Sequence, residues 1–128
     1  MLTVREHCGK HLIVEVWTDI DNPVLTDENV IRKAFLQGAA DSQATVIGHN
    51  WHSFGPGEGI TGVVMLSESH MSVHTWPEHG YASVDVYMCG DCDPHLSVPA
   101  ISNGLNAKRT EVTTLLRGVL TQKITIDK

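Results

Sequence analysis

Apolar residues recur along the chain with two periods, which divide it into helices and strands. Helical spacing from Thr26 to Asp41 predicts an amphipathic helix with Thr26 as its N-cap. A shorter helix is expected after Ser97, with Pro99 in its first turn. The other apolar runs are short, and they alternate or are rich in β-branched residues, as strands do. The predicted strands are residues 11–17, 44–54, 60–66, 71–76, 81–88 and 111–119, and residues 120–128 form a strand extension or a loose tail.

Strands gathered around two helices predict an α+β fold. The apolar stripe of each helix must be buried, and a sheet face is its natural partner. We therefore expect a two-layer α/β sandwich, with a mostly antiparallel sheet and two helices on one face. The nearly continuous apolar run at residues 60–66 is expected near the centre of the sheet. Residues 1–128 are expected to form a single domain.

Composition limits the possible partners. The formal net charge is −6 with neutral histidines, and no basic run appears, which argues against a nucleic-acid partner. No apolar run is long enough to span a bilayer, and the first residues do not form a signal peptide, so we expect no membrane partner and a cytoplasmic protein.

The three cysteines are Cys8, Cys89 and Cys92, an odd number that favours reduced thiols over a disulfide framework. The last two form a C-x-x-C pair, but a redox pair needs a helix that begins at the first cysteine, and here a strand ends there. The histidines show no H-E-x-x-H pattern, and the C-x-x-C has no second half, so no metal is expected. A small thiol or metal protein built on Cys89 and Cys92 stays open as an alternative.

Residues 66–90 carry more reactive groups than a structural segment needs. Glu68, Ser69 and His70 fall at a tight connection between two predicted strands. Ser69 could be an ordinary turn serine. It is a poor hydrolase nucleophile, because the G-x-S-x-G pattern and a following helix are both missing. It could also attack the carbonyl of its own preceding peptide bond, with His74 as the base if a strand reversal at Ser69–His70 brings the two together.

The sequence of this region resembles the bacterial and archaeal class of S-adenosylmethionine decarboxylase proenzymes. The resemblance is carried by S-E-S-H at 67–70 and H-T-W-P-E-H-G-Y-A-S-V-D-V-Y-M-C-G at 74–90. It extends more thinly over residues 8–118. The supporting segments are His11–Glu15, His52–Phe54, Gly62–Val64 and Ala107–Arg109.

The resemblance implies a role for each matching residue. Ser69 matches the serine that becomes a covalent pyruvoyl group when the chain cleaves itself between Glu68 and Ser69. His74 matches the histidine that assists this processing, and Thr61 stands where the family usually has a helping serine. Cys89 matches the proton donor in decarboxylation. Three further residues match or adjoin the expected substrate pocket: Phe54 as the adenine-stacking aromatic, Glu78 as a substrate-holding carboxylate, and Trp76 as a lining residue.

The implied function is decarboxylation of S-adenosylmethionine, which supplies the aminopropyl donor for spermidine synthesis. The substrate amine would form a Schiff base with the pyruvoyl group, which serves as electron sink in place of pyridoxal phosphate. No metal is implied. The family resemblance also implies a homodimer, with the site near or across the interface.

Two departures from the family pattern leave the substrate open. The turn at Gly55–Gly59 is one residue longer and richer in glycine than expected, next to Phe54. Asp93-Pro94-His95 replaces the usual Asp-Pro-Trp. A pyruvoyl-dependent ornithine or arginine decarboxylase is therefore the alternative enzyme, and a non-processing homologue that binds a ligand or partner is the alternative outside enzymes.

Overall fold

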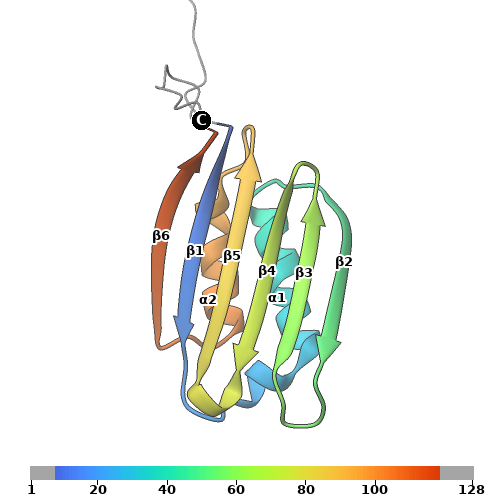
Figure 1. The fold of residues 1–128 in the computed structure, drawn as a ribbon, viewed down its shortest axis with the longest axis vertical. Helices are drawn as coiled ribbons and strands as arrows, with labels where there is room; N and C mark the ends of the chain where they lie inside the picture. Colours follow the sequence, from blue (N-terminus) through green and yellow to red (C-terminus); the bar gives the residue numbers. More distant parts are fainter. Residues whose placement is uncertain (1–7, 119–128) are drawn as a thin grey trace, which may run out of the picture.

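The computed structural model describes residues 8–118, which form one sheet with two helices on a single face (Figure 1). All strand pairs are antiparallel, and the order across the sheet is β2-β3-β4-β5-β1-β6. The predicted α+β sandwich is confirmed. The strands are β1 (Gly9–Trp17), β2 (Val46–Ser53), β3 (Ile60–Leu66), β4 (Ser69–Trp76), β5 (Tyr81–Cys89) and β6 (Arg109–Arg117). The helices are α1 (Glu28–Asp41) and α2 (Val98–Gly104), with 3-10 turns η1 (Pro23–Thr26), η2 (Pro77–His79) and η3 (Pro94–Ser97).

The core lies between the sheet and the helices, because alternate strand residues point towards α1 and α2. Fully buried side chains from β1, β4 and β5, such as Val14, Val73 and Val86, pack with Phe35 of α1 and Ile101 of α2. The other face of the sheet carries no helix (Figure 1). We call this second face the open face. It exposes two apolar residues of β3, Val63 at 38% and Met65 at 51%.

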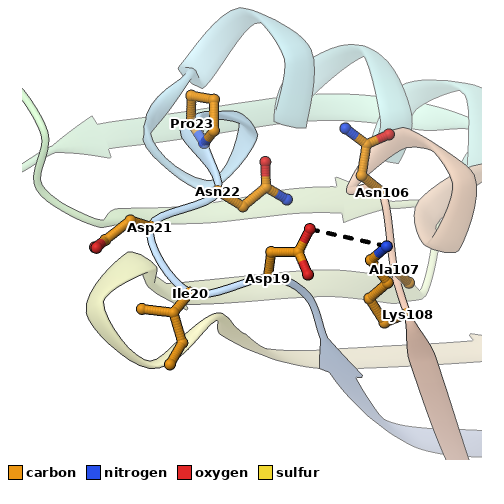
Figure 2. A pocket seen from close by; sticks show the side chains of 8 residues that line it. All are labelled: Asp19, Ile20, Asp21, Asn22, Pro23, Asn106, Ala107 and Lys108. Carbon is orange, nitrogen blue, oxygen red and sulfur yellow. Dashed lines mark ion pairs between the residues drawn. The ribbon is translucent and has the colours of Figure 1, made fainter.

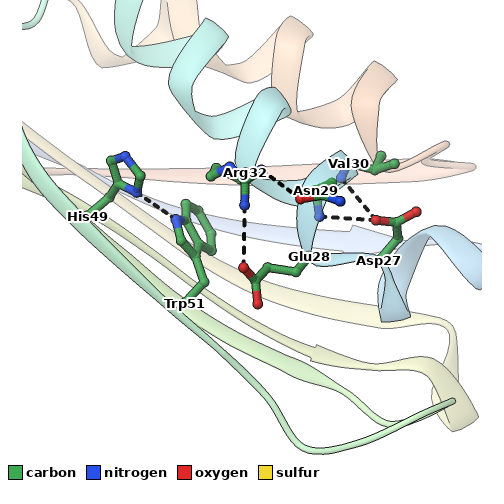
Figure 3. A network of polar contacts seen from close by, with 7 residues as sticks. All are labelled: Asp27, Glu28, Asn29, Val30, Arg32, His49 and Trp51. Carbon is green, nitrogen blue, oxygen red and sulfur yellow. Dashed lines mark hydrogen bonds and ion pairs between the residues drawn. The ribbon is translucent and has the colours of Figure 1, made fainter.

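The helix α1 begins one residue later than predicted, and Asp27 rather than Thr26 is its N-cap (Figure 3). The carboxylate of Asp27 accepts hydrogen bonds from the backbone N–H groups of Asn29 and Val30. Thr26 is the last residue of the 3-10 turn η1, which begins at Pro23, and its hydroxyl donates to the Pro23 carbonyl at 2.8 Å. The next residue, Asp27, directly precedes α1 and supplies a carboxylate, which is a good N-cap acceptor.

The helix α2 is likewise capped differently from the prediction. Ser97 donates its hydroxyl to the Pro94 carbonyl at 2.7 Å and makes no cap hydrogen bond. The cap of this region is Asp93, whose side chain accepts from the His95 N–H at the start of η3. Gly104 lets α2 approach α1, because a side chain there would collide with Ala34.

Other strand boundaries differ by a few residues. The strand predicted at 44–54 spans Val46–Ser53, and the last strand begins at Arg109 instead of 111. β3 is an interior strand with a neighbour on each side and lies next to the middle pair β4 and β5, as predicted for residues 60–66. Its continuous apolar character reflects two apolar side chains on the open face. The expectations for residues 119–128 lie outside the described residues.

Candidate functional site

The Glu68–Ser69 peptide lies at the upper end of the sheet in Figure 1, where β3 turns into β4. The turn consists of Ser67 and Glu68 alone, and Ser69 is already the first residue of β4. The reversal predicted at Ser69–His70 is therefore placed too late. Glu68 takes a left-handed backbone conformation, with φ at 61°. This conformation costs a non-glycine residue about 1 kcal/mol, so the peptide is held in a mildly strained turn.

Cys89, the last residue of β5, contacts both sides of this peptide bond. Its backbone N–H donates to Ser69 Oγ at 3.1 Å. Its Sγ donates to the Glu68 carbonyl oxygen, also at 3.1 Å. A cavity of about 260 Å³ opens beside them, lined by Cys8, Ser67, Glu68, Cys89 and Gly90. We call this group of Glu68, Ser69 and Cys89 the serine end. It places a hydroxyl, the carbonyl it could attack, and a donor for the resulting oxyanion within hydrogen-bonding distance.

Thr61 and His74 meet at the other end of the same strands. They are register partners on β3 and β4, and Thr61 Oγ1 lies 3.0 Å from His74 Nδ1. With Nδ1 occupied in this way, Nε2 of His74 is left to exchange a proton.

A cavity of about 360 Å³ adjoins this pair and brings the predicted pocket residues together. Phe54 and Trp76 supply aromatic rings, and Glu78 and Glu58 supply carboxylates. Trp76 stacks on Tyr81 with ring centroids 5.5 Å apart, whereas Phe54 is 61% exposed. We call Phe54, Thr61, His74, Trp76 and Glu78 the histidine end.

Glu58 is a pocket residue that the sequence reading missed. The available signal was a single acid between two glycines in the turn that follows Phe54. Among residues 8–118, neither Glu58 nor Glu78 has an ion-pair partner within 4.0 Å. The cavity therefore carries two carboxylates without a basic partner from Lys or Arg in the described part of the chain.

The two ends are separated along β4 and do not meet within one chain. Ser69 and His74 are five residues apart in an unbroken strand, a separation of roughly 16 Å at about 3.3 Å per residue. Their side chains also belong to opposite faces of the sheet. Ser69 shares its face with the buried Met71 and Val73, whereas His74 belongs to the open face. A base for Ser69 thus cannot come from His74 of the same folded chain.

A polar network crosses the middle of the open face between the two ends. His11 Nε2 lies 2.9 Å from Asp85 Oδ1, and Ser72 donates to the other carboxylate oxygen at 3.2 Å. Next to it, the Tyr81 hydroxyl donates to Glu15 at 2.6 Å. Burial, followed by this hydrogen bond, raises the pKa of Tyr81 above its ordinary value. Asp85 is thus paired with groups of two neighbouring strands.

A larger cavity, about 530 Å³, contains none of the predicted site residues (Figure 2). It lies between the loop after β1 and the loop before β6, where Lys108 Nζ is 3.8 Å from Asp19 Oδ2. Its most buried polar side chain, Asn22, already donates to the Leu105 carbonyl and accepts from the Val24 N–H. Size alone therefore does not identify the functional cavity.

The other reactive groups of the sequence are the cysteines and the candidate metal ligands. Cys8, Cys89 and Cys92 are free thiols, and no helix starts at Cys89. Within residues 8–118, no three His, Cys, Asp or Glu side chains converge as metal ligands. In the same range, neither helix has the length and apolar character that crossing a bilayer requires.

The chain is similar to known proteins over most of its length. The family model described as S-adenosylmethionine decarboxylase matches residues 10–118. An S-adenosylmethionine decarboxylase proenzyme of Bacillus cytotoxicus is 46% identical over 111 residues, covering 86% of this chain and 84% of the relative. One from Bacillus velezensis is 44% identical over 115 residues, 89% of each chain. The crystal structure of the adenosylmethionine decarboxylase from Aquifex aeolicus matches with a TM-score of 0.80 at 31% identity, covering 95% of this chain and 100% of that one.

Proposed function

This chain belongs to the S-adenosylmethionine decarboxylase family, and we propose that it cleaves itself between Glu68 and Ser69 and then decarboxylates S-adenosylmethionine. One observation carries the proposal. Cys89 contacts Ser69 Oγ through its N–H and the Glu68 carbonyl through its thiol, each at 3.1 Å. A turn serine with only a structural role needs no thiol on the preceding carbonyl. The relatives named above support the substrate, and none of them bears an ornithine or arginine decarboxylase name.

Processing begins when Ser69 Oγ attacks the carbonyl carbon of Glu68. The carbonyl electrons move to the oxygen, which the Cys89 thiol stabilises, and the hydroxyl proton goes to a base. The C–N bond then breaks, the amine takes up a proton, and an ester joins Glu68 to the Ser69 side chain. Loss of the α-proton of residue 69 expels the Glu68 carboxylate and leaves dehydroalanine. Its imine tautomer is hydrolysed by water to release ammonia, and residue 69 becomes a pyruvoyl group.

The base for this reaction comes, in our proposal, from a second copy of the chain. His74 is about 16 Å from Ser69 along its own strand. A dimer that pairs open faces can bring the His74 of one copy to the serine end of the other, because Cys89, whose N–H contacts Ser69 Oγ, itself belongs to the open face. The open face supports such pairing, because Val63 and Met65 are exposed there without a covering helix. Thr61 would orient His74 by accepting from Nδ1–H, which leaves Nε2 to take the serine proton.

The residues also fit the reaction that follows processing. A pyruvoyl group at position 69 supplies an electron sink for the bond that loses carbon dioxide. Cys89 carries a thiol proton beside this position, where the substrate carbon needs one. Phe54 offers a ring face for the adenine. Glu78 offers a carboxylate for hydroxyl or amino groups of the substrate.

Two measurements test the proposal. Intact mass should show the 14.0 kDa chain replaced with time by residues 1–68 and by a fragment that starts at residue 69, lighter by the conversion of serine to pyruvoyl. Carboxyl-labelled S-adenosylmethionine, ornithine and arginine, assayed side by side, should release labelled carbon dioxide from the first alone. An unbroken chain with no release from any of the three would exclude the decarboxylase.

A further inference from the structure

Four side chains form a row across one end of the sheet, from β4 through β5 and β1 to β6 (Figure 1). They are Trp76, Tyr81, Trp17 and Arg109. Trp76 is the register partner of Tyr81, Tyr81 is that of Trp17, and Trp17 is that of Arg109. Because register partners on neighbouring strands point to the same side of a sheet, all four side chains belong to the open face. We call this group the aromatic row.

Tyr81 is the middle ring of the aromatic row. It stacks on Trp76 of β4, with 5.5 Å between the ring centroids and 23° between the planes. Trp17, from the strand on the other side of β5, packs on Tyr81 at 4.6 Å. The Arg109 guanidinium follows at 5.3 Å from the Trp17 ring, within cation–π range. Tyr81 therefore cannot turn without losing its contacts with both indole rings.

The hydroxyl of Tyr81 is held as firmly as its ring. It donates to Glu15 Oε1 at 2.6 Å, a length typical of a hydroxyl bound to an ionised carboxylate. Glu15 lies two residues before Trp17 on β1, so the two side chains share the open face. The ring rests against Trp17 and the hydroxyl against Glu15. Both torsions of the Tyr81 side chain are thus fixed by β1.

Trp76 connects the aromatic row to the substrate cavity. Trp76 and Glu78 both line the cavity at the histidine end, whereas Tyr81 lies outside it. Trp76 and Tyr81 also flank η2, the short turn that carries Glu78. Trp76 is 39% exposed, so an indole without a stacking partner there would sample other rotamers. The stack on Tyr81 restricts it to the rotamer that faces the cavity.

We propose that Tyr81 is a positioning residue for substrate binding, which holds the Trp76 indole in place at the cavity before the substrate arrives. The inference rests on the decarboxylase function proposed above. Tyr81 contacts no reacting atom and acts through Trp76. With a mobile indole, only a fraction of the molecules is ready to bind, and the apparent affinity falls by that fraction. Bound substrate holds the indole itself, so kcat stays the same.

Kinetics of fully cleaved protein test this role. Tyr81→Leu removes both the stack and the hydrogen bond and should raise KM for S-adenosylmethionine about tenfold, with kcat unchanged. Ile101→Val, which shortens a fully buried side chain of α2, is the packing control and should leave KM unchanged. Wild-type KM in Tyr81→Leu would overturn the role of Tyr81. A loss confined to kcat would overturn it as well.

Two milder variants keep the inference testable if Tyr81→Leu folds poorly. Tyr81→Phe keeps the ring and Glu15→Ala keeps the hydroxyl, and each should raise KM about threefold because the same hydrogen bond is lost. The double variant should also show an increase of about threefold, since the second change finds no bond left to remove. An increase of about ninefold in the double variant would mean that the two residues act independently, and would contradict the proposal.

Fluorine NMR of protein labelled with fluorotryptophan follows the indole directly. The chain has three tryptophans, Trp17, Trp51 and Trp76, which substitution by Phe assigns one at a time. Tyr81→Leu should shift the signals of Trp17 and Trp76 and leave that of Trp51, which packs against Phe35 of α1. An unmoved Trp76 signal would contradict the role of Tyr81. A wild-type protein that releases no carbon dioxide from S-adenosylmethionine would instead overturn the proposed function.

Discussion

The serine end and the histidine end hold their reactive groups in different ways. At the serine end the contacts use main-chain atoms, since Cys89 reaches Ser69 through its N–H and meets the carbonyl of Glu68. Strand pairing between β4 and β5 fixes these atoms. At the histidine end the groups are side chains, and Phe54 and Trp76 are 61% and 39% exposed. One end is assembled by main-chain contacts within a single chain, and the other is a set of partly exposed side chains.

In the proposed mechanism, this difference would keep one strand from reacting before the dimer forms. β4 holds Ser69 at its start and His74 near the opposite end. A monomer would thus have the proposed nucleophile without its base. In the proposed dimer the two ends of different copies complete each other, so processing would follow association.

Removal of the nucleophile should have the largest effect. Ser69→Ala eliminates the hydroxyl that attacks Glu68, so neither cleavage nor decarboxylation should be detectable by intact mass and carbon dioxide release. Ser67→Ala is the matched control in the same turn, because the Ser67 contact is made by its backbone N–H to Thr45. Retention of decarboxylase activity in Ser69→Ala would remove the serine end from the mechanism.

Mixed variants test whether the two ends act across copies. His74→Ala and Ser69→Ala should each remain uncleaved alone. Coexpressed in equal amounts, random pairing would place about half of the His74→Ala chains opposite an intact histidine end. About half of all the His74→Ala chains, and none of the Ser69→Ala chains, should then cleave, as judged by mass. No cleavage in the mixture, with a dimer present by light scattering, would contradict a shared site.

A substitution in the histidine-end cavity should separate binding from processing. Glu58→Gln removes one of two carboxylates in the cavity and should raise KM for the cationic S-adenosylmethionine about five- to tenfold, as expected for one polar contact. The cleavage rate should be unaffected, because the Thr61–His74 pair proposed to act in processing is held by its own hydrogen bond and not by Glu58. Glu28→Gln on α1, whose partner is Arg32, serves as the charge-matched control. An unchanged KM in Glu58→Gln would leave Glu78 as the relevant carboxylate.

The smallest effect concerns the Asp93 cap of η3. Burial acts to raise the pKa of Asp93, but hydrogen bonds from the backbone and ring of His95 outweigh it and lower the pKa below its ordinary value. The ionised carboxylate is therefore the stabilising form. Asp93→Ala should lose about 1 kcal/mol of unfolding free energy at pH 7 through the missing cap. The difference from wild type should vanish as the pH falls from about 4 through the lowered pKa. Urea unfolding at several pH values measures this, and a constant difference would contradict it.

Much of the fold could be predicted from sequence, because alternation along β5 and helical spacing along α1 each report one buried face. The N-cap of α1 could not be predicted, since Thr26 and Asp27 are both good N-cap residues and only the η1 turn decides between them. The residues of both ends could be named from their resemblance to a family. The distance between the two ends could not be predicted, because Glu68 and Ser69 have weak strand propensity and the tight turn depends on a glutamate in the left-handed conformation. Glu58 enters the site because the turn after Phe54 lies beside the end of β4 in space, which its position in the sequence does not show.

The strand order also determines what remains after the proposed cut. Residues 1–68 contribute β1, β2 and β3, and the downstream piece contributes β4, β5 and β6. In the sheet these alternate, so that β1 of the first piece lies between β5 and β6 of the second. Neither fragment contains more than two adjacent strands, too few for a stable sheet. The mature protein would therefore unfold into two molecules, and its refolding would depend on concentration. The uncleaved chain can refold by itself, whereas the cleaved protein would have to reassemble from two fragments.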